Sequence, residues 1–405
     1  LPIVEVSDIA AESRFSVFTK ALEAGAACCL AEYMPEGVTG PVILVEDVQA
    51  ALERICAEYR RGLSIPVIGI TGSVGKTTAK EMISSVLEQR LNVLKTEGNL
   101  NNQIGVPMTV SRIEREHEAA VIEMGISGFG EMTALARIAQ PTVAVFTVIG
   151  HAHLEFLHDL EGVFRAKTEM LAFMPEDGTV IYNGDDAMLR KLSCPQRLVS
   201  CGLGEDCAVR AADIEQLPDG RIRCRISYNG RSIRAEIPAY GQHMVYAALE
   251  GAAVGFMMGL GDEEIERGIA VYRTVGRRGV VTDTGYVTLV DDCYNANPDP
   301  AVNGMERSLR QYLIGQNLSA VLHNGDRGLI AGRFKSKYLQ IIRLISNSKS
   351  LIRRPPSGRR NSFSFFRRGE SCAWRRARSP VRCSPALRAS GMQAQALQLL
   401  MQAHL

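Results

Sequence analysis

The sequence of 405 residues contains no run of about 18 uninterrupted apolar residues, the length that a membrane-spanning helix needs. Its first residues lack the basic stretch and long apolar core of a secretory signal. The ten cysteines are scattered without metal-ligand spacing, and the adjacent pair Cys28 and Cys29 suits neither a CxxC clamp nor a disulfide framework. We therefore expect a cytoplasmic protein without a membrane span, whose thiols are reduced.

Charge is distributed unevenly. Of the 46 Lys and Arg residues, 16 lie in residues 331–405, where Glu370 is the single acidic residue. The preceding part thus holds 30 basic and 43 acidic residues, and this acidic body gives no electrostatic reason to expect nucleic-acid binding. The basic tail either binds RNA or membrane surfaces or is a segment without selected structure, such as an out-of-frame end. Low-complexity stretches such as 353–360 cannot bury a core. Because interleaving aromatic residues are few and the shift in composition is abrupt, we favour the second interpretation.

Composition and periodicity predict an α/β protein. An apolar content of 46% and a charged content of 22% are typical of globular proteins. Residues 1–63 form a small α/β pattern, with helices expected at 15–30 and 48–59 and a strand at 42–45. From 64 to 279, apolar strands alternate with helices, which predicts a parallel sheet covered on both faces.

The elements expected in this central part follow from runs of apolar residues and their spacing. The strands are 66–70, 119–123, 142–149 and 179–182, and the helices are 79–89, 131–139, 160–171 and 242–258. Short alternating runs at 221–237 predict antiparallel strands appended to the sheet, and 280–291 predicts strands that open a further unit.

The stretch Gly72-Ser73-Val74-Gly75-Lys76-Thr77-Thr78 lies between a predicted strand and a predicted helix. Strand, glycine turn and helix together point a row of backbone N–H groups at a phosphate. The lysine can bridge the β- and γ-phosphates, and Thr77 has a hydroxyl that ligates Mg²⁺. The spacing is shorter than that of the standard Walker motif. A chance surface turn is the alternative, but the flanking elements favour a nucleotide site.

Polar side chains follow the next two predicted strands. Glu123 ends one of them, where its carboxylate is either a hard-cation ligand or a solvated strand-end side chain. His151 and His153 follow the other, and they are weak evidence for zinc because no further ligand is suitably spaced. A histidine that joins Glu123 at a magnesium site is the sharper hypothesis, although a polar loop explains the stretch equally well. Lys167 lies on a predicted helix, and the local sequence indicates a surface lysine.

Two further stretches are rich in amides. Asn101 and Asn102 belong to a loop, 99–105, that could contact sugars, carboxylates or phosphates, or could simply form a turn. Residues 291–298 end a strand with two carboxylates, an aromatic ring and two amides, one of them Asn295. An aromatic ring beside an amide suits an adenine ring, which needs a face to stack on and an edge to hydrogen-bond.

Taken together, these stretches resemble the Mur ligases of peptidoglycan synthesis. The stretches that carry the resemblance are 71–78, 98–102, 121–125, 152–155, 166–169, 241–246 and 291–298. The resemblance implies a three-domain α/β fold with a central P-loop domain built on a parallel sheet. The implied parts are a shortened N-terminal UDP-substrate domain at 1–63, an ATP-binding domain at 64–279 and the start of a C-terminal ligase domain at 280–330. Composition predicts that 331–405 is a basic low-complexity tail without ordered structure. Residues 299–405 depart from the family's third-domain pattern, so we expect that domain to be degenerate.

The resemblance also implies an ATP-dependent amide synthesis. A monomer would join D-alanyl-D-alanine to UDP-N-acetylmuramoyl-tripeptide through an acyl phosphate, without nucleic acid as a partner. The alternative is a non-catalytic nucleotide-binding remnant of such a ligase.

The site residues implied by the resemblance are assigned as follows. ATP would be held by Gly72, Ser73, Val74, Gly75, Lys76, Thr77, Thr78 and Asn295. One Mg²⁺ would be bound by Thr77 and Glu123, and a second by His153 and a carbamylated Lys167. Lys76, His153 and Lys167 would be the catalytic residues, and Asn101 and Asn102 would face the substrate.

Overall fold

The structure is a computed structural model that describes residues 18–34, 40–217, 220–239, 241–275, 280–283 and 288–291. Two units are distinguished, and nearly all described residues belong to the first, which holds residues 1–282 and 289–319. The predicted tail at 331–405 and most of the predicted third domain lie outside the described residues. The domain boundaries drawn from the sequence therefore stay predictions.

A short parallel pair of strands forms near the N-terminus. Strand β1 (Cys29–Ala31) pairs with β2 (Val42–Leu44), with Leu30 opposite Ile43. The predicted strand at 42–45 is confirmed. The helix predicted over 15–30 is wrong at its end, because Cys29–Ala31 forms β1. The described helical residues are 18–23, and Gly25, at φ 93°, has the left-handed backbone that commonly ends a helix.

Helix α2 (Val48–Arg61) confirms the helix predicted at 48–59. It begins at Asp47, whose carboxylate accepts the N–H of Ala50 at 2.8 Å. The helix packs against α4 (Gly105–Ser111) and α5 (Glu131–Ala139). Near its end the buried Arg60 side chain donates to four backbone carbonyls, those of Leu63, Ile65, Ala139 and Gln140.

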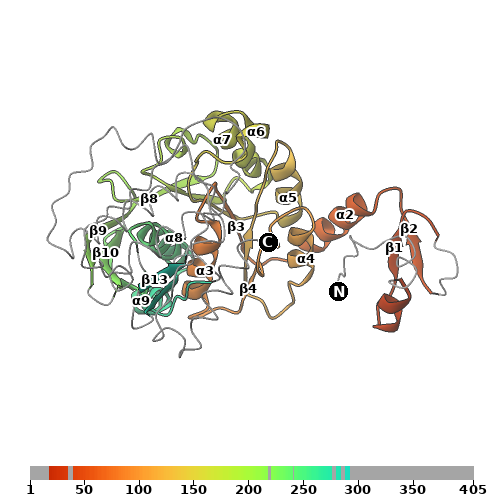
Figure 1. The fold of residues 1–405 in the computed structure, drawn as a ribbon, viewed down its shortest axis with the longest axis horizontal. Coiled ribbons are helices and arrows are strands. Elements are labelled where there is room, and N and C mark those ends of the chain that lie inside the picture. Colours follow the sequence, from red (N-terminus) through yellow and green to blue (C-terminus); the bar gives the residue numbers. More distant parts are fainter. Residues whose placement is uncertain are drawn as a thin grey trace, which may run out of the picture. The chain divides into compact units, whose positions relative to one another are not determined.

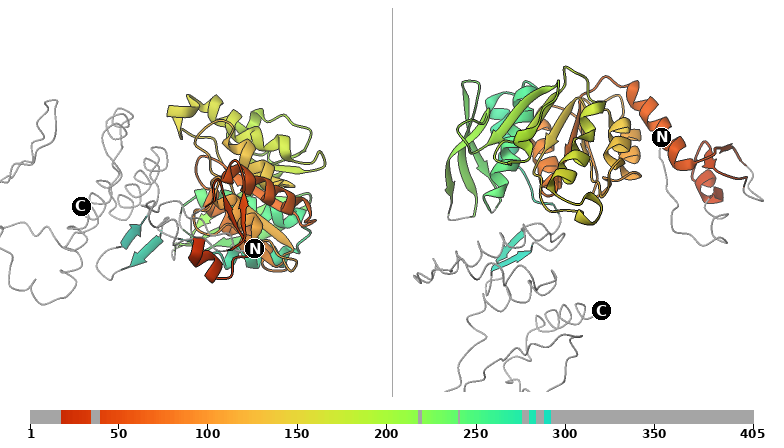
Figure 2. Two further views of the ribbon diagram at one scale, coloured as in Figure 1. Left: turned by 90° about the vertical axis from the view of Figure 1, so that its right-hand side faces the viewer. Right: turned by 90° about the horizontal axis from the view of Figure 1, so that it is seen from above.

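The centre of the fold is a nine-stranded sheet in the described part of the chain (Figure 1). Its order is β11-β10-β9-β8-β7-β6-β3-β5-β4, and the strands from β9 to β4 run parallel. These parallel strands are β3 (Val67–Thr71), β4 (Val93–Lys95), β5 (Ala119–Glu123), β6 (Val143–Phe146), β7 (Thr179–Asn183), β8 (Arg197–Gly202) and β9 (Val209–Gln216). Strands β10 (Ile222–Tyr228) and β11 (Arg231–Ile237) continue the sheet antiparallel, as predicted, and Figure 2 shows them in green at one end.

Helices cover both faces of this sheet, as the alternation of strands and helices predicts (Figure 1). One face packs against α3 (Lys76–Leu87), α8 (His243–Met257) and α9 (Asp262–Ala270). The other packs against α4, α5 and α7 (Leu160–Thr168), and α2 packs on α4 and α5. Because β3 lies between these layers, all five of its residues are buried, which explains why polar and apolar residues do not alternate along it and why only its last residue, Thr71, is polar.

The remaining elements are short. They are α6 (Leu154–Leu157), the 3₁₀ helices η1 (Glu169–Phe173) and η2 (Leu189–Lys191), and the paired strands β12 (Val280–Asp283) and β13 (Thr288–Asp291). The helix predicted over 160–171 is thus an α-helix that continues as 3₁₀. The strand predicted over 142–149 ends at Phe146, because the backbone of 147–150 turns to contact the glycine loop after β3.

Candidate functional site

The predicted site residues lie where three adjacent strands of the sheet end. Strand β3 pairs with β5 on one side and β6 on the other, and Ile70 lies opposite Glu123. The glycine loop follows β3, Glu123 ends β5, and the histidine loop follows β6. The chain runs outward in both directions from β3, and such a switch point beyond the carboxyl ends of parallel strands is where α/β sheets bind ligands.

The glycine loop at 72–75 leads directly into α3. Gly72 has φ 155°, and a Cβ at this position would lie 2.0 Å from Oγ1 of Thr147, so no larger residue fits without a shift. The hydroxyl of Thr147 donates to the carbonyl of Val74 at 2.6 Å and holds the loop from the side of β6. Nζ of Lys76 donates to the carbonyl of Gly72 at 2.9 Å. The loop therefore ends at a helix N-terminus, where free N–H groups and the helix dipole favour a phosphate.

Glu123 connects this loop to two other segments. Its Oε2 accepts the hydroxyl of Thr77 at 2.9 Å, and its Oε1 accepts the amide of Asn101 at 2.8 Å. Its backbone N–H donates to Oγ1 of Thr96 at 3.0 Å. The residue is only 2% exposed, so it is not the solvated strand-end glutamate that the sequence left open. A buried carboxylate that accepts from a hydroxyl and an amide offers oxygen ligands of the kind that Mg²⁺ prefers.

Lys167 is buried and not a surface lysine, contrary to its local sequence. Its exposure is 2%, and burial together with the charge of Lys76 lowers the pKa of its amine to about 7. The side chain lies on the apolar stripe of α7, in line with the buried Val163, Ala166 and Met170. This spacing was the signal in the sequence that could have revealed its burial.

His153 lies in the same electrostatic environment. Burial lowers the pKa of its imidazole, and the charges of Lys167 and Lys76 lower it further, against an opposing effect of Glu131. The imidazole is therefore biased to its neutral form, in which it can ligate a metal. His153 directly precedes α6 and has a left-handed backbone, with φ 55°. Among the described residues, no group of three or more His, Cys, Asp or Glu side chains forms a metal site by itself.

The two asparagines differ in their surroundings. Asn101 contacts Glu123, whereas Oδ1 of Asn102 accepts the N–H groups of Ile104 and Gly105 at 3.2 and 2.9 Å. Asn102 thus closes the turn before α4. For this part of the loop, the alternative of a simple turn is correct. Asn295 lies outside the described residues.

Sequence reasoning missed several residues that support the site. Nζ of the buried Lys80 donates to the carbonyl of Thr96 at 2.7 Å and also pairs with Glu81, so it anchors the residue that holds Glu123. Oε2 of Glu169 accepts both the N–H and the hydroxyl of Thr133, at 3.2 and 3.0 Å, at the start of α5. Their signal is faint, since charged residues such as these on helices usually lie in solvent.

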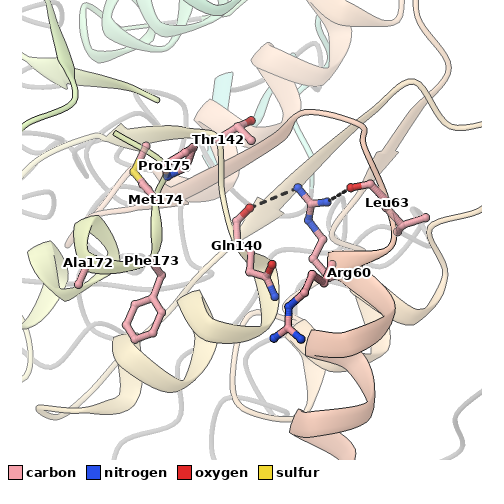
Figure 3. A pocket seen from close by; sticks show the side chains of 9 residues that line it. Arg60, Leu63, Gln140, Thr142, Ala172, Phe173, Met174 and Pro175 are labelled. Carbon is pink, nitrogen blue, oxygen red and sulfur yellow. Dashed lines mark hydrogen bonds between the residues drawn. The ribbon is translucent and has the colours of Figure 1, made fainter. Parts of the chain in front are cut away.

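A pocket of about 450 Å³ lies elsewhere in the fold (Figure 3). Its lining includes Leu63, which precedes β3, and Thr142, which precedes β6, so it lies at the opposite, amino ends of the strands. Figure 3 shows the guanidinium of Arg60 donating to the carbonyls of Leu63 and Gln140. Thr142 is likewise engaged by the backbone of Val67. Because these polar groups already bind within the protein, the pocket has little left for a ligand.

The chain is similar in sequence and in fold to known proteins. The Mur ligase middle domain matches residues 70–255. The UDP-N-acetylmuramoyl-tripeptide–D-alanyl-D-alanine ligase of Bacillus subtilis is 37% identical over 291 residues, which are 70% of this chain and 62% of that protein. The ligase of the same name from Escherichia coli is 33% identical over 285 residues, covering 69% of this chain and 63% of that protein. The chain thus spans less than two thirds of the length of these curated relatives.

Solved structures agree with these relatives. The MurF ligase from Thermotoga maritima, in complex with ADP, superposes with a TM-score of 0.66 at 28% identity, covering 73% of this chain and 69% of that one. MurF from Acinetobacter baumannii also gives a TM-score of 0.66, at 30% identity, covering 72% of this chain and 64% of that one.

Proposed function

Because the chain belongs to the Mur ligase family through the middle domain at residues 70–255, we propose that it is an ATP-dependent amide-bond ligase. The substrates that we propose are UDP-N-acetylmuramoyl-tripeptide and D-alanyl-D-alanine, which the curated relatives have in their names. The observation that carries the proposal is Glu123, which is buried beside the glycine loop and contacts both Thr77 and Asn101.

The glycine loop and the start of α3 are the proposed ATP-phosphate site. The backbone N–H groups of residues 72–78, other than that of Ser73, which donates to the carbonyl of Val148, would hold the phosphate oxygens. Lys76 would neutralise their charge once its amine leaves the carbonyl of Gly72. We propose Asn295 as a contact to the adenine on the resemblance alone, since it lies outside the described residues.

The residues around Glu123 fit a magnesium ion. The hydroxyl of Thr77 and the carboxylate of Glu123 are 2.9 Å apart, and both are hard oxygen donors. Two protein oxygens suffice, because Mg²⁺ in phosphate-transferring sites usually takes its other ligands from water and substrate phosphates. The ion would supply charge neutralisation between the phosphates and the attacking carboxylate.

Lys167 and His153 are the proposed ligands of a second ion. An amine with a pKa of about 7 is substantially neutral at physiological pH, and a neutral amine is the form that adds carbon dioxide. The adduct releases a proton to solvent, and the resulting carbamate carries a negative charge. It would therefore be attracted to Lys76, whereas the protonated amine is repelled by it. His153, biased to the neutral imidazole, would contribute nitrogen.

These residues support the following reaction. The free carboxylate of the tripeptide attacks the γ-phosphate, the bond to the β-phosphate oxygen breaks, and ADP leaves. The amine of D-alanyl-D-alanine then attacks the acyl carbon, loses a proton and expels phosphate through a tetrahedral intermediate. Two anions must meet in the first step, so positioning and charge neutralisation by Lys76 are the contributions required of the chain. Asn101, held against Glu123, and Asn102 are proposed on the substrate side.

A product assay tests the function. Phosphate release must require both UDP-N-acetylmuramoyl-tripeptide and D-alanyl-D-alanine, and mass spectrometry must find the joined product at one phosphate per molecule. Replacing Lys76 by Ala should abolish turnover. Turnover with glutamate and a folate instead would place the chain in the folate-polyglutamate branch. Nucleotide binding without any turnover would favour the non-catalytic remnant.

The location and the oligomeric state of the protein are also proposed. We propose a cytoplasmic location, where the nucleotide-linked substrate is soluble, and no described helix is long and apolar enough to cross a membrane. A monomeric state is proposed from the resemblance, and sedimentation of the purified chain at several concentrations would reveal any larger assembly.

A further inference from the structure

Asp186 lies in the turn after β7 and uses both carboxylate oxygens as acceptors. Its Oδ1 accepts the N–H groups of Met188 and Leu189 at 2.8 and 3.1 Å and so closes the turn before η2. Its Oδ2 accepts the N–H of Ile149 at 2.7 Å. Because Ile149 belongs to the loop between β6 and α6, this hydrogen bond joins the ends of two neighbouring strands.

The residues on either side of Ile149 contact Ser73 of the glycine loop. The N–H of Ser73 donates to the carbonyl of Val148 at 2.8 Å. The hydroxyl of Ser73 donates to the carbonyl of Gly150 at 3.0 Å and accepts the N–H of Gly150 at 2.9 Å. Three consecutive backbone positions are therefore fixed, the outer two by Ser73 and the middle one by Asp186.

We propose that Asp186 is a positioning residue for nucleotide binding. By fixing the N–H of Ile149, it holds the loop at 147–153 against Ser73 and keeps the glycine loop in the shape that receives phosphates. A loop that is ordered before binding loses less conformational entropy when the ligand arrives. The inference rests on the proposed function, because it takes the glycine loop as the nucleotide site. The same loop leads to His153, so Asp186 also helps to position the backbone from which the His153 imidazole extends.

The neighbouring Asp185 provides a matched control. It too accepts with both oxygens, but its partners are the N–H groups of Leu203 and Gly204 and the hydroxyl of Tyr246. These partners lie in the β8–β9 turn and on α8, away from the loop at 147–153 that Asp186 contacts. An Asp-to-Asn change at either position removes one charge and one acceptor with no change in volume, because an amide has a single acceptor oxygen.

The test is calorimetric titration of the full chain with MgADP, for the wild type, Asp186→Asn and Asp185→Asn. In Asp186→Asn the amide oxygen can keep the turn to Met188 and Leu189, which leaves an NH₂ group facing the N–H of Ile149. We expect its Kd for MgADP to rise about tenfold, and that of Asp185→Asn to change less than about twofold. In turnover assays, the KM for ATP of Asp186→Asn should rise more than kcat falls.

Coupling to Ser73 separates positioning from a general loss of structure. If Asp186 acts through the loop that grips Ser73, the double variant Ser73→Ala/Asp186→Asn should bind MgADP little worse than Ser73→Ala alone. The pair Ser73→Ala/Asp185→Asn should instead be additive. Should Asp186→Asn not fold, Asp186→Ser keeps the local turn through its hydroxyl, loses the reach to Ile149, and should show the same weakening.

The outcomes are distinguishable. A wild-type protein that binds MgADP, with unchanged affinity in a folded Asp186 variant, would overturn the role of Asp186 and leave the proposed function standing. A wild-type protein that binds no MgADP would overturn the nucleotide site itself, and the inference with it.

Discussion

The hydroxyl of Thr77 donates a 2.9 Å hydrogen bond to Oε2 of Glu123, across 46 positions of sequence. This contact joins the first turn of α3 to the end of β5, and it brings together the two oxygen donors proposed for one Mg²⁺. The proposed phosphate loop and the proposed metal-binding end of β5 are therefore already joined by a hydrogen bond in the protein without nucleotide.

Thr77→Val should distinguish the contribution of the hydroxyl to activity from that of the side-chain shape. Valine has nearly the same volume but no oxygen, so it leaves Glu123 without this donor and the proposed ion without one ligand. We expect kcat/KM for ATP to fall about 100-fold, equivalent to roughly 2.7 kcal/mol of transition-state stabilisation. Thr77→Ser keeps the hydroxyl and should stay within about fivefold of the wild type. Equal activity of the valine and serine variants would refute the assignment.

Lys167→Met should change how stability depends on pH. In carbon-dioxide-free buffer, the folded state releases the Lys167 proton near pH 7, whereas the unfolded state keeps it to about pH 10.5. The unfolded state thus binds more protons between these values, so the wild type gains stability as pH rises from 7 to 10.5. Below pH 7 the buried charge of Lys167 lowers the free energy of unfolding by up to about 5 kcal/mol, and Lys167→Met removes this loss.

Urea denaturation at pH 6, 8 and 10 measures the effect. The stabilisation of Lys167→Met over the wild type should be largest at pH 6 and shrink towards pH 10. Lys191→Met is the control, because Lys191 is exposed and pairs with Glu161 at the surface. A difference between Lys167→Met and the wild type that does not vary with pH would contradict the lowered pKa.

Glu250→Gln should stabilise the fold at neutral pH. Burial inside α8 raises the pKa of the Glu250 carboxyl to about 8, from about 4.5 when unfolded. The folded state therefore binds more protons between these values, and stability falls as pH rises from 4.5 to 8. At pH 7 the buried carboxyl lowers the free energy of unfolding by at most roughly 3 kcal/mol.

Thermal unfolding between pH 4 and pH 9 tests this prediction. Glu250→Gln should unfold at a higher temperature than the wild type above pH 5, and the two should converge near pH 4. The exposed Glu205, changed to Gln, should follow the wild type throughout. Glu250 interacts electrostatically with the thiol of Cys201 on β8. Burial, and then Glu250, raise the pKa of that thiol, so it stays protonated across this range.

Glu169→Ala should loosen the start of α5. Gly130, before the helix, has no side chain to cap it, and Glu169 accepts the N–H groups of Gly130 and Thr133 from 39 and 36 residues away. Loss of this cap should cost about 1–2 kcal/mol in urea denaturation. Glu161→Ala removes an exposed pair with Lys191 and an exposed charge in the first turn of α7, and should cost less than about 0.5 kcal/mol. Similar losses in both variants would mean that Glu169 is not a cap.

Much of the parallel core could be predicted from sequence. Strand β5 and helix α5 have the bounds expected from their apolar runs, because a strand buried on both faces leaves an unbroken apolar signal. The end of β6 was placed three residues too late. Val148 and Ile149 are apolar enough to continue a strand, and their turn is imposed by hydrogen bonds to Ser73 and Asp186, which local propensity does not contain.

The site was predicted in its chemistry but not in its contacts. Glu123 at a strand tip could be expected near the loop, whereas its bonds to Thr77 and Asn101 depend on how β3, β4 and β5 stack. The local sequence of Lys167, with Arg165 and Glu169 two positions away on either side, indicates an exposed lysine. Its burial depends on how the apolar side of α7 packs with α5 and the core, which the local sequence does not contain.

The four carbonyls that Arg60 caps have a practical consequence for dissecting this chain. A fragment cut at residue 64 would take away the guanidinium, and with it the donors that serve the carbonyls of Ala139 and Gln140. It would also strip from α4 and α5 the helix that packs on them. A fragment that begins just before Asp47 keeps Arg60 and α2, and we expect it to retain nucleotide binding in isolation.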